Sequence, residues 1–218
     1  MEAHLGAAAV RRLASLFLGV NRNKRSIVLD LKLAEARDVL LRLVDTADVF
    51  VHNIRPQKLD KLGLGSEALL KRNPRLVYAG IHGWREDGPY SGRPAYDDII
   101  QGLCGVAALM DKLTGQPRYA PTILADKTCG LVAAQSILAA LYHREKTGRG
   151  QFVEIPMFET MVSFVMVEHL FGRTFVPGKA DPGYTAWNYA GIPFFTSDVC
   201  PIGTLFFVHN DGYKKAVL

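Results

Sequence analysis

The sequence lacks the patterns that mark several common classes of protein. Its 218 residues include only three cysteines, Cys104, Cys129 and Cys200, which are widely spaced and form no CxxC pair. A disulfide framework and a zinc site are therefore both unexpected. No GxGxxG, GxxxxGK[ST], GxSxG or HExxH pattern occurs, which disfavours dinucleotide-binding proteins, P-loop nucleotidases, serine hydrolases and zinc proteases. The six histidines show no metal-ligand spacing, so no metal site is predicted.

Long apolar runs and glycosylation sequons are also missing. No run reaches the roughly 18 consecutive apolar residues that a membrane span needs, and no membrane partner is expected. The excess of 26 basic over 21 acidic residues is dispersed along the chain, which suits an anionic ligand rather than a nucleic acid. The isolated cysteines favour a reducing compartment, and a cytoplasmic location is predicted.

The first 20 residues leave a second location open. Arg11 and Arg12 stand among alanines and leucines, with Glu2 as the one acidic residue of this segment. Both an ordinary surface helix and an amphipathic mitochondrial presequence fit this pattern.

The pattern of apolar residues predicts strands and helices in alternation along the first 83 residues. Strands are expected at 26–30, 49–53 and 76–83, with helices at about 33–46 and 66–72 between them. Such alternation predicts an α/β fold with a Rossmann-like parallel sheet flanked by helices, in which ligands bind at the carboxyl ends of the strands.

The second half of the chain continues the same pattern. The segment 84–96 contains two glycines and two prolines and is predicted to be a loop. Helices are expected at 97–110, 126–143 and 157–171 and a strand at 151–155, with Gly148 and Gly150 marking the end of the second helix. Beyond Gly172 the residues show no clear period.

Two polar segments are candidate binding sites. NRNKRS at 21–26 places basic residues just before the first predicted strand, where they suit either a phosphate or a solvated turn. VHNIRPQKLDKLG at 51–63 follows the second predicted strand, and surface polarity explains its polar residues equally well. His52 alternates with Val51, which is expected to be buried.

Asp126 is the acidic residue with the most distinctive surroundings, because it lies between an apolar ILA triplet and a long apolar helix. One interpretation is that it is the N-cap residue of this helix. The other is that the helix start keeps its carboxylate ionised as a nucleophile for acyl transfer, with Gly130 allowing a close approach.

Six segments of the chain form a series of motifs: NRNKRSIVLDL, ADVFVHNIRPQKLDKLG, NPRLVYAGIHGWREDGPY, PAYDDIIQGLCG, ADKTCGLVAAQSILAALYHREKTGRGQ and VEIPMFETMV, in that order. Together they resemble class III CoA-transferases, the CaiB/BaiF superfamily, which includes formyl-CoA:oxalate and carnitine CoA-transferases and the α-methylacyl-CoA racemases. The resemblance extends from about Asn21 to Ala190. It implies transfer of coenzyme A from an acyl-CoA to a carboxylic acid.

The resemblance also implies particular residue roles. ADKTCG matches the motif of the catalytic aspartate, so Asp126 is predicted to form a covalent aspartyl-CoA intermediate. Contacts to coenzyme A are predicted for Leu29, Lys32, Asn53, Ile54 and Lys61. The family fold implies an interlocked homodimer. On this basis residues 1–20 are an N-terminal extension, 21–175 the core of the large domain, and 176–218 an atypical linker or the start of a small domain.

The chain departs from the family pattern in ways that leave alternatives open. It lacks the opening strand and Gly-Pro loop of the family, and relatives continue for roughly as many residues again. An inactive truncated family member is therefore one alternative. Racemisation is another, but Tyr96 stands where racemases carry a histidine base, and phenol side chains lose their proton only well above neutral pH.

Overall fold

The computed structural model describes residues 15–179 of the chain. The extension predicted at 1–20 and the atypical segment predicted at 176–218 therefore lie largely outside the described residues. Residues 1–41 and 42–218 form two compact units, which are described separately.

The first unit contains helix α2 (Ser15–Val20), an irregular segment, and the beginning of helix α3 (Ala34–Thr46). The strand predicted at 26–30 is wrong: this segment has no strand partner among the described residues, and Val28 is 94% exposed. Local contacts replace the ladder. The Asp30 carboxylate accepts the N–H of Lys32 (3.0 Å), and the Arg37 guanidinium donates to the Lys32 carbonyl (2.9 Å).

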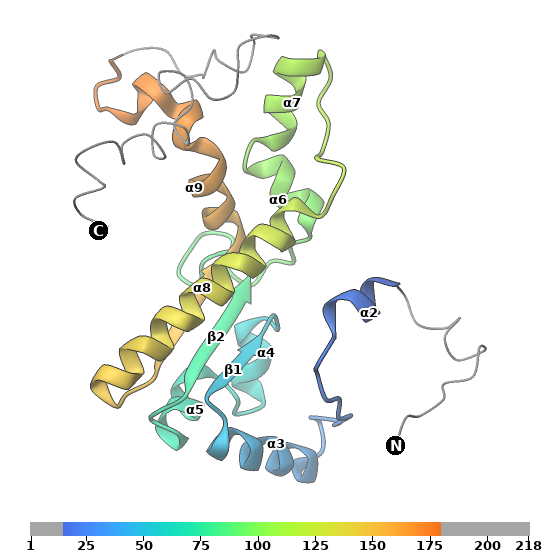
Figure 1. Cartoon of the computed structure of the whole chain (residues 1–218), viewed down its shortest axis with the longest axis vertical. Helices are drawn as coiled ribbons and strands as arrows, with labels where there is room; N and C mark the ends of the chain where they lie inside the picture. Colours follow the sequence, from blue (N-terminus) through green and yellow to red (C-terminus); the bar gives the residue numbers. More distant parts are fainter. Residues whose placement is uncertain (1–14, 180–218) are drawn as a thin grey trace, which may run out of the picture. The chain divides into compact units, whose positions relative to one another are not determined.

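The second unit is built on a three-stranded parallel sheet. Its strands are β1 (Val49–His52), β2 (Val77–His82) and β3 (Gln151–Pro156), in the order β1-β2-β3. Val51 lies opposite Ala79 in the register, and Ala79 lies opposite Val153. The parallel α/β sheet predicted from the sequence is thereby confirmed (Figure 1).

Helices connect and cover these strands. Between β1 and β2 lie α4 (Pro56–Lys61) and α5 (Ser66–Arg72); between β2 and β3 lie α6 (Asp97–Leu103), α7 (Val106–Thr114) and α8 (Leu124–Thr147); after β3 come α9 (Met157–Leu170) and the 3-10 turn η1 (Phe171–Thr174). The single helix predicted at 97–110 is two helices. Gly105, with φ 98°, lies in the left-handed region between them, and glycine enters that region without strain.

Both faces of β2 are covered, because successive side chains of a strand point to opposite faces and nearly all of those on β2 are buried. On one face the Tyr78 hydroxyl donates to the Leu64 carbonyl between α4 and α5 (3.1 Å). On the other face Ala79 packs in a core cluster with Cys129 and Ala133 of α8. This sheet with helices on both faces brings the carboxyl ends of its strands to one edge.

Helix α8 is the longest element among the described residues and crosses the sheet (Figure 1). It packs against β2, β3, α6 and α9. It ends as predicted at Gly148, which has φ 74° and whose N–H donates to the Arg144 carbonyl (2.7 Å). By length and composition α8 is also the one described helix that could span a membrane, a test that the core helix of a soluble protein passes as well.

Candidate active site

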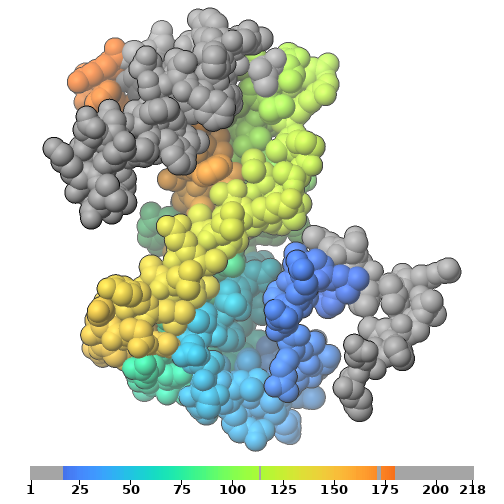
Figure 2. Space-filling model, in the orientation of Figure 1, coloured from blue at the N-terminus to red at the C-terminus, as the bar shows by residue number. Residues whose placement is uncertain are grey.

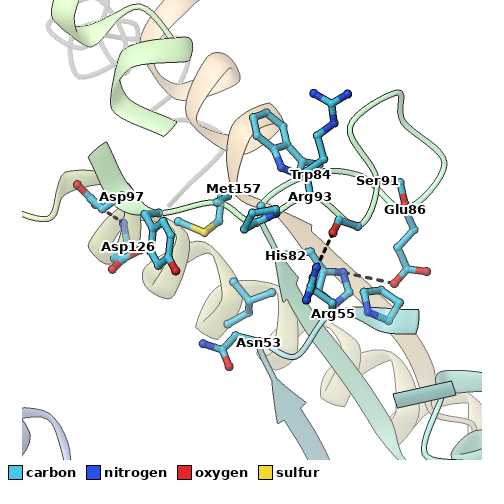
Figure 3. A pocket seen from close by; sticks show the side chains of 17 residues that line it. Asn53, Arg55, His82, Trp84, Glu86, Ser91, Arg93, Asp97, Asp126 and Met157 are labelled. Atoms are coloured by element: carbon cyan, nitrogen blue, oxygen red, sulfur yellow. Dashed lines mark hydrogen bonds and ion pairs between the residues drawn. The ribbon is translucent and has the colours of Figure 1, made fainter. Parts of the chain in front are cut away.

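A cavity of about 420 Å³ opens at the carboxyl ends of β1 and β2. Its walls come from six places: the segment after β1, the end of β2, the loop 83–96, and the first turns of α6, α8 and α9. Side chains from these places meet in the cavity (Figure 3), among them Asn53, Arg55, His82, Glu86, Arg93, Tyr96, Asp97, Asp126 and Met157. This is the edge at which parallel α/β sheets bind their ligands.

Asp126 lines this cavity from the first turn of α8. The N-cap interpretation is wrong, because the helix begins at Leu124, its N-cap residue is Ile123, and no side chain caps it. The backbone N–H of Asp126 instead donates to the Asp97 carboxylate (2.9 Å). Asp126 therefore lies inside the helix start, with its carboxyl group free of a capping role.

The surroundings of Asp126 act against the expected stabilisation of its anion by the helix start. Partial burial, and after it the neighbouring Asp97 carboxylate, raise the pKa of Asp126 above its ordinary value. Both effects disfavour the anion. A carboxylate of raised pKa is a stronger base, and hence a better nucleophile once it is ionised.

Asp97 connects the starts of two helices. One carboxylate oxygen accepts the Asp126 N–H, and the other accepts from the Gln101 side chain (2.5 Å). Gln101 is buried and also binds the segment before α8, donating to the Thr122 carbonyl (3.1 Å) and accepting the N–H of Ala120 (2.9 Å). The sequence alone did not single out this network.

His52 and His82 lie beside each other at the ends of β1 and β2, with ring centroids 5.5 Å apart. The expected alternation is reversed, since Val51 is exposed and His52 is partly buried. Burial, and after it the neighbouring His52, lower the pKa of His82 to about 4. Nδ1 of His82 lies 3.3 Å from a Glu86 carboxylate oxygen. His82 and Glu86 lie at the opposite end of the cavity from Asp97 and Asp126 (Figure 3).

The loop 83–96, predicted as a loop, is held by elements far from it in the sequence. Carboxylates accept two of its backbone N–H groups: Glu154 of β3 binds that of Glu86 (2.6 Å), and Glu159 of α9 binds that of Arg85 (3.4 Å). The Arg55 guanidinium donates to the carbonyl of Gly92 (3.2 Å). The cavity wall is thus fixed from three sides.

The structure brings only part of the predicted coenzyme A site together with Asp126. Asn53 lines the cavity. Ile54 lies beside it and donates its N–H to His52 Nδ1 (3.2 Å), whereas Lys61 is exposed in the last turn of α4, away from the cavity lining. Leu29 and Lys32 belong to the other compact unit. Their roles in binding coenzyme A remain predictions.

Three described side chains present atoms that suit a metal ion. Ligand atoms of His82, Glu86 and Glu154 lie within 4.8 Å of one another, and a nitrogen with carboxylate oxygens is a donor set that zinc accepts. One Glu154 oxygen is already occupied by the Glu86 N–H. The absence of a metal, expected from the sequence, stays a prediction.

Several cavity residues were not predicted, chiefly His82, Glu86 and Arg93. The available signal was their position at a strand end and in the Gly- and Pro-rich loop that follows it, where ligand contacts concentrate. Gly130 was singled out, but it lies inside α8, where its N–H belongs to the helix ladder.

The site defines an α/β protein with a carboxylate-lined cavity at the carboxyl ends of the strands of a parallel sheet. CoA-transferase family III matches residues 4–194. A crystal structure of a CAIB/BAIF family protein from Brucella suis is 35% identical with a TM-score of 0.68, over 75% of this chain and 42% of that one.

Curated relatives agree with this match. The probable fatty acyl-CoA transferase Rv3272 of Mycobacterium tuberculosis is 36% identical over 187 residues, which are 84% of this chain and 48% of that protein. The acetyl-CoA:oxalate CoA-transferase of Acetobacter aceti is 41% identical over 75% of this chain and 42% of that protein. The chain belongs to CoA-transferase family III, and it spans about half the length of these relatives or less.

Proposed function

We propose that this protein transfers coenzyme A from an acyl-CoA donor to a carboxylic acid acceptor, with Asp126 as the nucleophile. The observation that carries the proposal is the Asp126 carboxyl group, which lines a cavity of about 420 Å³ at the carboxyl ends of β1 and β2. Membership of CoA-transferase family III supports the reaction class, and the relatives named above include an acetyl-CoA:oxalate CoA-transferase.

The proposed reaction begins when the ionised Asp126 attacks the thioester carbonyl of the donor. This attack forms a mixed anhydride and releases the coenzyme A thiolate. The thiolate then attacks the aspartyl carbonyl, which frees the donor acid and leaves coenzyme A as a thioester on Asp126. The acceptor carboxylate attacks this thioester to form a second anhydride, and the thiolate takes the acceptor acyl group, which restores the Asp126 carboxylate.

Other side chains of the cavity fit this chemistry. Arg55 and Arg93 line the same cavity, and guanidinium groups suit the carboxylates and phosphates of the two substrates. Each attack creates an oxyanion that needs a hydrogen-bond donor. Gly130 is unsuited to this because its N–H is engaged in α8.

The test is a covalent adduct. Incubation with an acyl-CoA should add the mass of coenzyme A, less water, to the protein and to the peptide containing ADKTCG. Asp126→Asn should lose the adduct, because an amide oxygen is not an anionic nucleophile. Its free energy of unfolding should change by less than about 1 kcal/mol, since Asp126 has no capping role.

The matched control is Asp98→Asn, which removes the same charge from an exposed residue of α6 outside the cavity lining. Its adduct should form as in the wild type. An adduct mapped to Asp97 or Cys129, or one that survives in Asp126→Asn, would refute the proposed nucleophile.

We also propose that the protein is a homodimer. Apolar side chains remain exposed along α8, where Leu131 is 75% and Leu138 67% exposed. Exposed apolar stripes of this kind mark association surfaces. The fold of the family supports the same expectation.

A further inference from the structure

We propose that Asp97 is a positioning residue for the nucleophile, and that its carboxylate both holds the first turn of α8 and promotes acylation of Asp126. This inference rests on the proposed function of Asp126. Asp97 is the first residue of α6 and lines the same cavity. The Asp97 carboxylate is directed at the backbone N–H of Asp126 across the two helix starts (Figure 3).

The positioning role follows from the two oxygens of Asp97. One accepts the backbone N–H of Asp126 at 2.9 Å, and the other accepts from Gln101 at 2.5 Å. Gln101 is buried with its remaining hydrogen bonds satisfied by the segment just before α8. The nucleophile is therefore attached to a fixed point of α6, and it cannot shift without breaking a hydrogen bond to a charged group.

The promoting role follows from charge. Before the attack, the ionised Asp126 lies beside a second anion, and the two repel each other. When Asp126 becomes an anhydride or a thioester it is neutral, so this repulsion disappears. Asp97 therefore destabilises the free carboxylate relative to the acylated form. The raised pKa of Asp126, to which Asp97 contributes, agrees with this.

Other titratable groups around Asp126 do not provide this effect. On its own helix, the Lys127 ammonium is turned away and donates to the Thr122 hydroxyl (2.6 Å). Burial raises the pKa of the Cys129 thiol to about 11, and that of Cys104 of α6 is also raised, so both are neutral near pH 7. Among the described residues, Glu86 is the one other acid that lines the cavity, and it lies at the opposite end from Asp126 (Figure 3). The remaining titratable groups of the lining are Arg55, His82, Arg93 and Tyr96.

The experiment has two readouts on the full chain, in wild type, Asp97→Asn and Asp97→Ala, with Asp98→Asn as the control. The first is the titration of the Asp126 carboxyl group, followed by carbon-13 NMR and assigned with Asp126→Asn. Removal of the Asp97 charge should move the Asp126 midpoint to lower pH in both variants, and Asp98→Asn should leave it in place. This readout needs no turnover.

The second readout is the rate of aspartyl-CoA formation. Asp97→Ala should slow it about 100-fold, because loss of the contact misplaces the nucleophile. Asp97→Asn retains an acceptor for the Asp126 N–H and should be slowed less. The acid limb of its pH profile should also move to lower pH. Binding of free coenzyme A should stay within about twofold of wild type, because both proposed effects of Asp97 act on the position and the acylation of Asp126.

The outcomes distinguish a failure of the proposed function from a failure of the proposed role of Asp97. If wild type forms no adduct on Asp126 but the midpoint moves in Asp97→Asn, the proposed function fails while the electrostatic contact stands. If the adduct forms on Asp126 and neither the midpoint nor the rate changes in the Asp97 variants, the role of Asp97 is refuted. If circular dichroism shows that Asp97→Asn and Asp97→Ala are unfolded, Asp97→Glu is the deciding variant. It keeps the negative charge but displaces the carboxylate from the Asp126 N–H, so normal acylation in this variant would refute the positioning role of Asp97.

Discussion

The Arg144 guanidinium donates a 2.8 Å hydrogen bond to the Asp48 carboxylate and so connects the C-terminal part of α8 to the residue before β1. The same nitrogen also lies near the carbonyl oxygens of Asp48 (3.5 Å) and Arg75 (3.4 Å). The two partners differ in burial, since the Arg144 side chain is 10% exposed and that of Asp48 is 76% exposed.

This difference predicts unequal effects of removing each partner. Arg144→Leu should lower the free energy of unfolding by about 2–3 kcal/mol, because the largely buried Arg144 side chain loses its packing together with its hydrogen bonds to Asp48 and Arg75. Asp48→Asn should cost less than about 1 kcal/mol, because the amide oxygen of asparagine can still accept from Arg144 and the exposed Asp48 carboxylate is solvated. Urea denaturation of both variants measures the difference, and equal losses would contradict the asymmetry.

The lowered pKa of His82 predicts that the protein loses folding stability in acid. A histidine of ordinary pKa 6.5 in the unfolded chain has a pKa of about 4 in the fold. As the pH falls, the unfolded chain therefore binds the proton first. The free energy of unfolding is unaffected by His82 above about pH 6.5 and decreases as the pH falls toward 4. The loss at pH 4 should be roughly 3 kcal/mol. Denaturation midpoints between pH 7.5 and 4.5 should follow this course.

The matched variants for this prediction are His82→Phe and His143→Gln. His82→Phe keeps a ring of similar size without a titrating group and should flatten the pH dependence in this range. His143 is exposed on α8, and its replacement should leave the curve as it is in wild type. An unchanged slope in His82→Phe would assign the acid sensitivity to other groups.

The exposed stripe of α8 predicts how the chain associates. Leu131, Leu138 and Tyr142 are spaced so that they share one face of the helix, and Tyr142 is 66% exposed. Figure 2 shows α8 along the surface of the described chain. The double substitution Leu131→Lys and Leu138→Lys should shift sedimentation velocity profiles from dimer to monomer. Folding stability should fall by less than about 1 kcal/mol, because these side chains are already solvated.

The control is Glu67→Lys, which changes charge in the same direction on an exposed position of α5 and should leave the association state unaltered. A wild type that sediments as a monomer at all concentrations would contradict the proposed homodimer.

Tyr96 lines the same cavity as Asp126 and stands where racemases carry a histidine base. Replacing it therefore tests transferase against racemase chemistry. With an α-methylacyl-CoA in deuterated water, the wild type should keep the α-proton, because a phenol is a poor base near neutral pH. Tyr96→His, which introduces the histidine of the racemase pattern, should raise exchange above that background. Mass spectrometry of the recovered thioester measures both, and rapid exchange with inversion in wild type would overturn the transferase proposal.

The sequence predicted the elements whose apolar pattern is dictated by burial alone. β2 is buried on both faces and its sequence is a nearly continuous apolar run. The strand predicted at 76–83 therefore agrees with the observed Val77–His82 within one residue at each end. The segment 26–30 also has an apolar centre, IVL at 27–29, but an apolar run does not supply the neighbouring strand that a ladder requires. The break at Gly105 was also missed, because a glycine within an apolar helical pattern is compatible with either a continuous or an interrupted helix.

The candidate site was predictable only where local context marks a residue. Asp126 stands out beside a long apolar helix, whereas its neighbour Asp97 is one of two adjacent acids at a helix start. Their contact depends on how α6 and α8 cross, which pairs residues 29 positions apart. A single sequence contains no signal for that crossing.

The anchoring of the loop 83–96 has a consequence for how the chain acquires its cavity. Its backbone is held by Glu154 and Glu159, which lie 68 and 74 positions further along. During synthesis from the N-terminus, β1, β2 and the loop therefore emerge before the residues that fix the loop. Such long-range closure is slow compared with helix formation. The cavity is thus among the last parts of the molecule to be completed, and a nascent chain that ends before β3 holds Asp126 without a finished cavity around it.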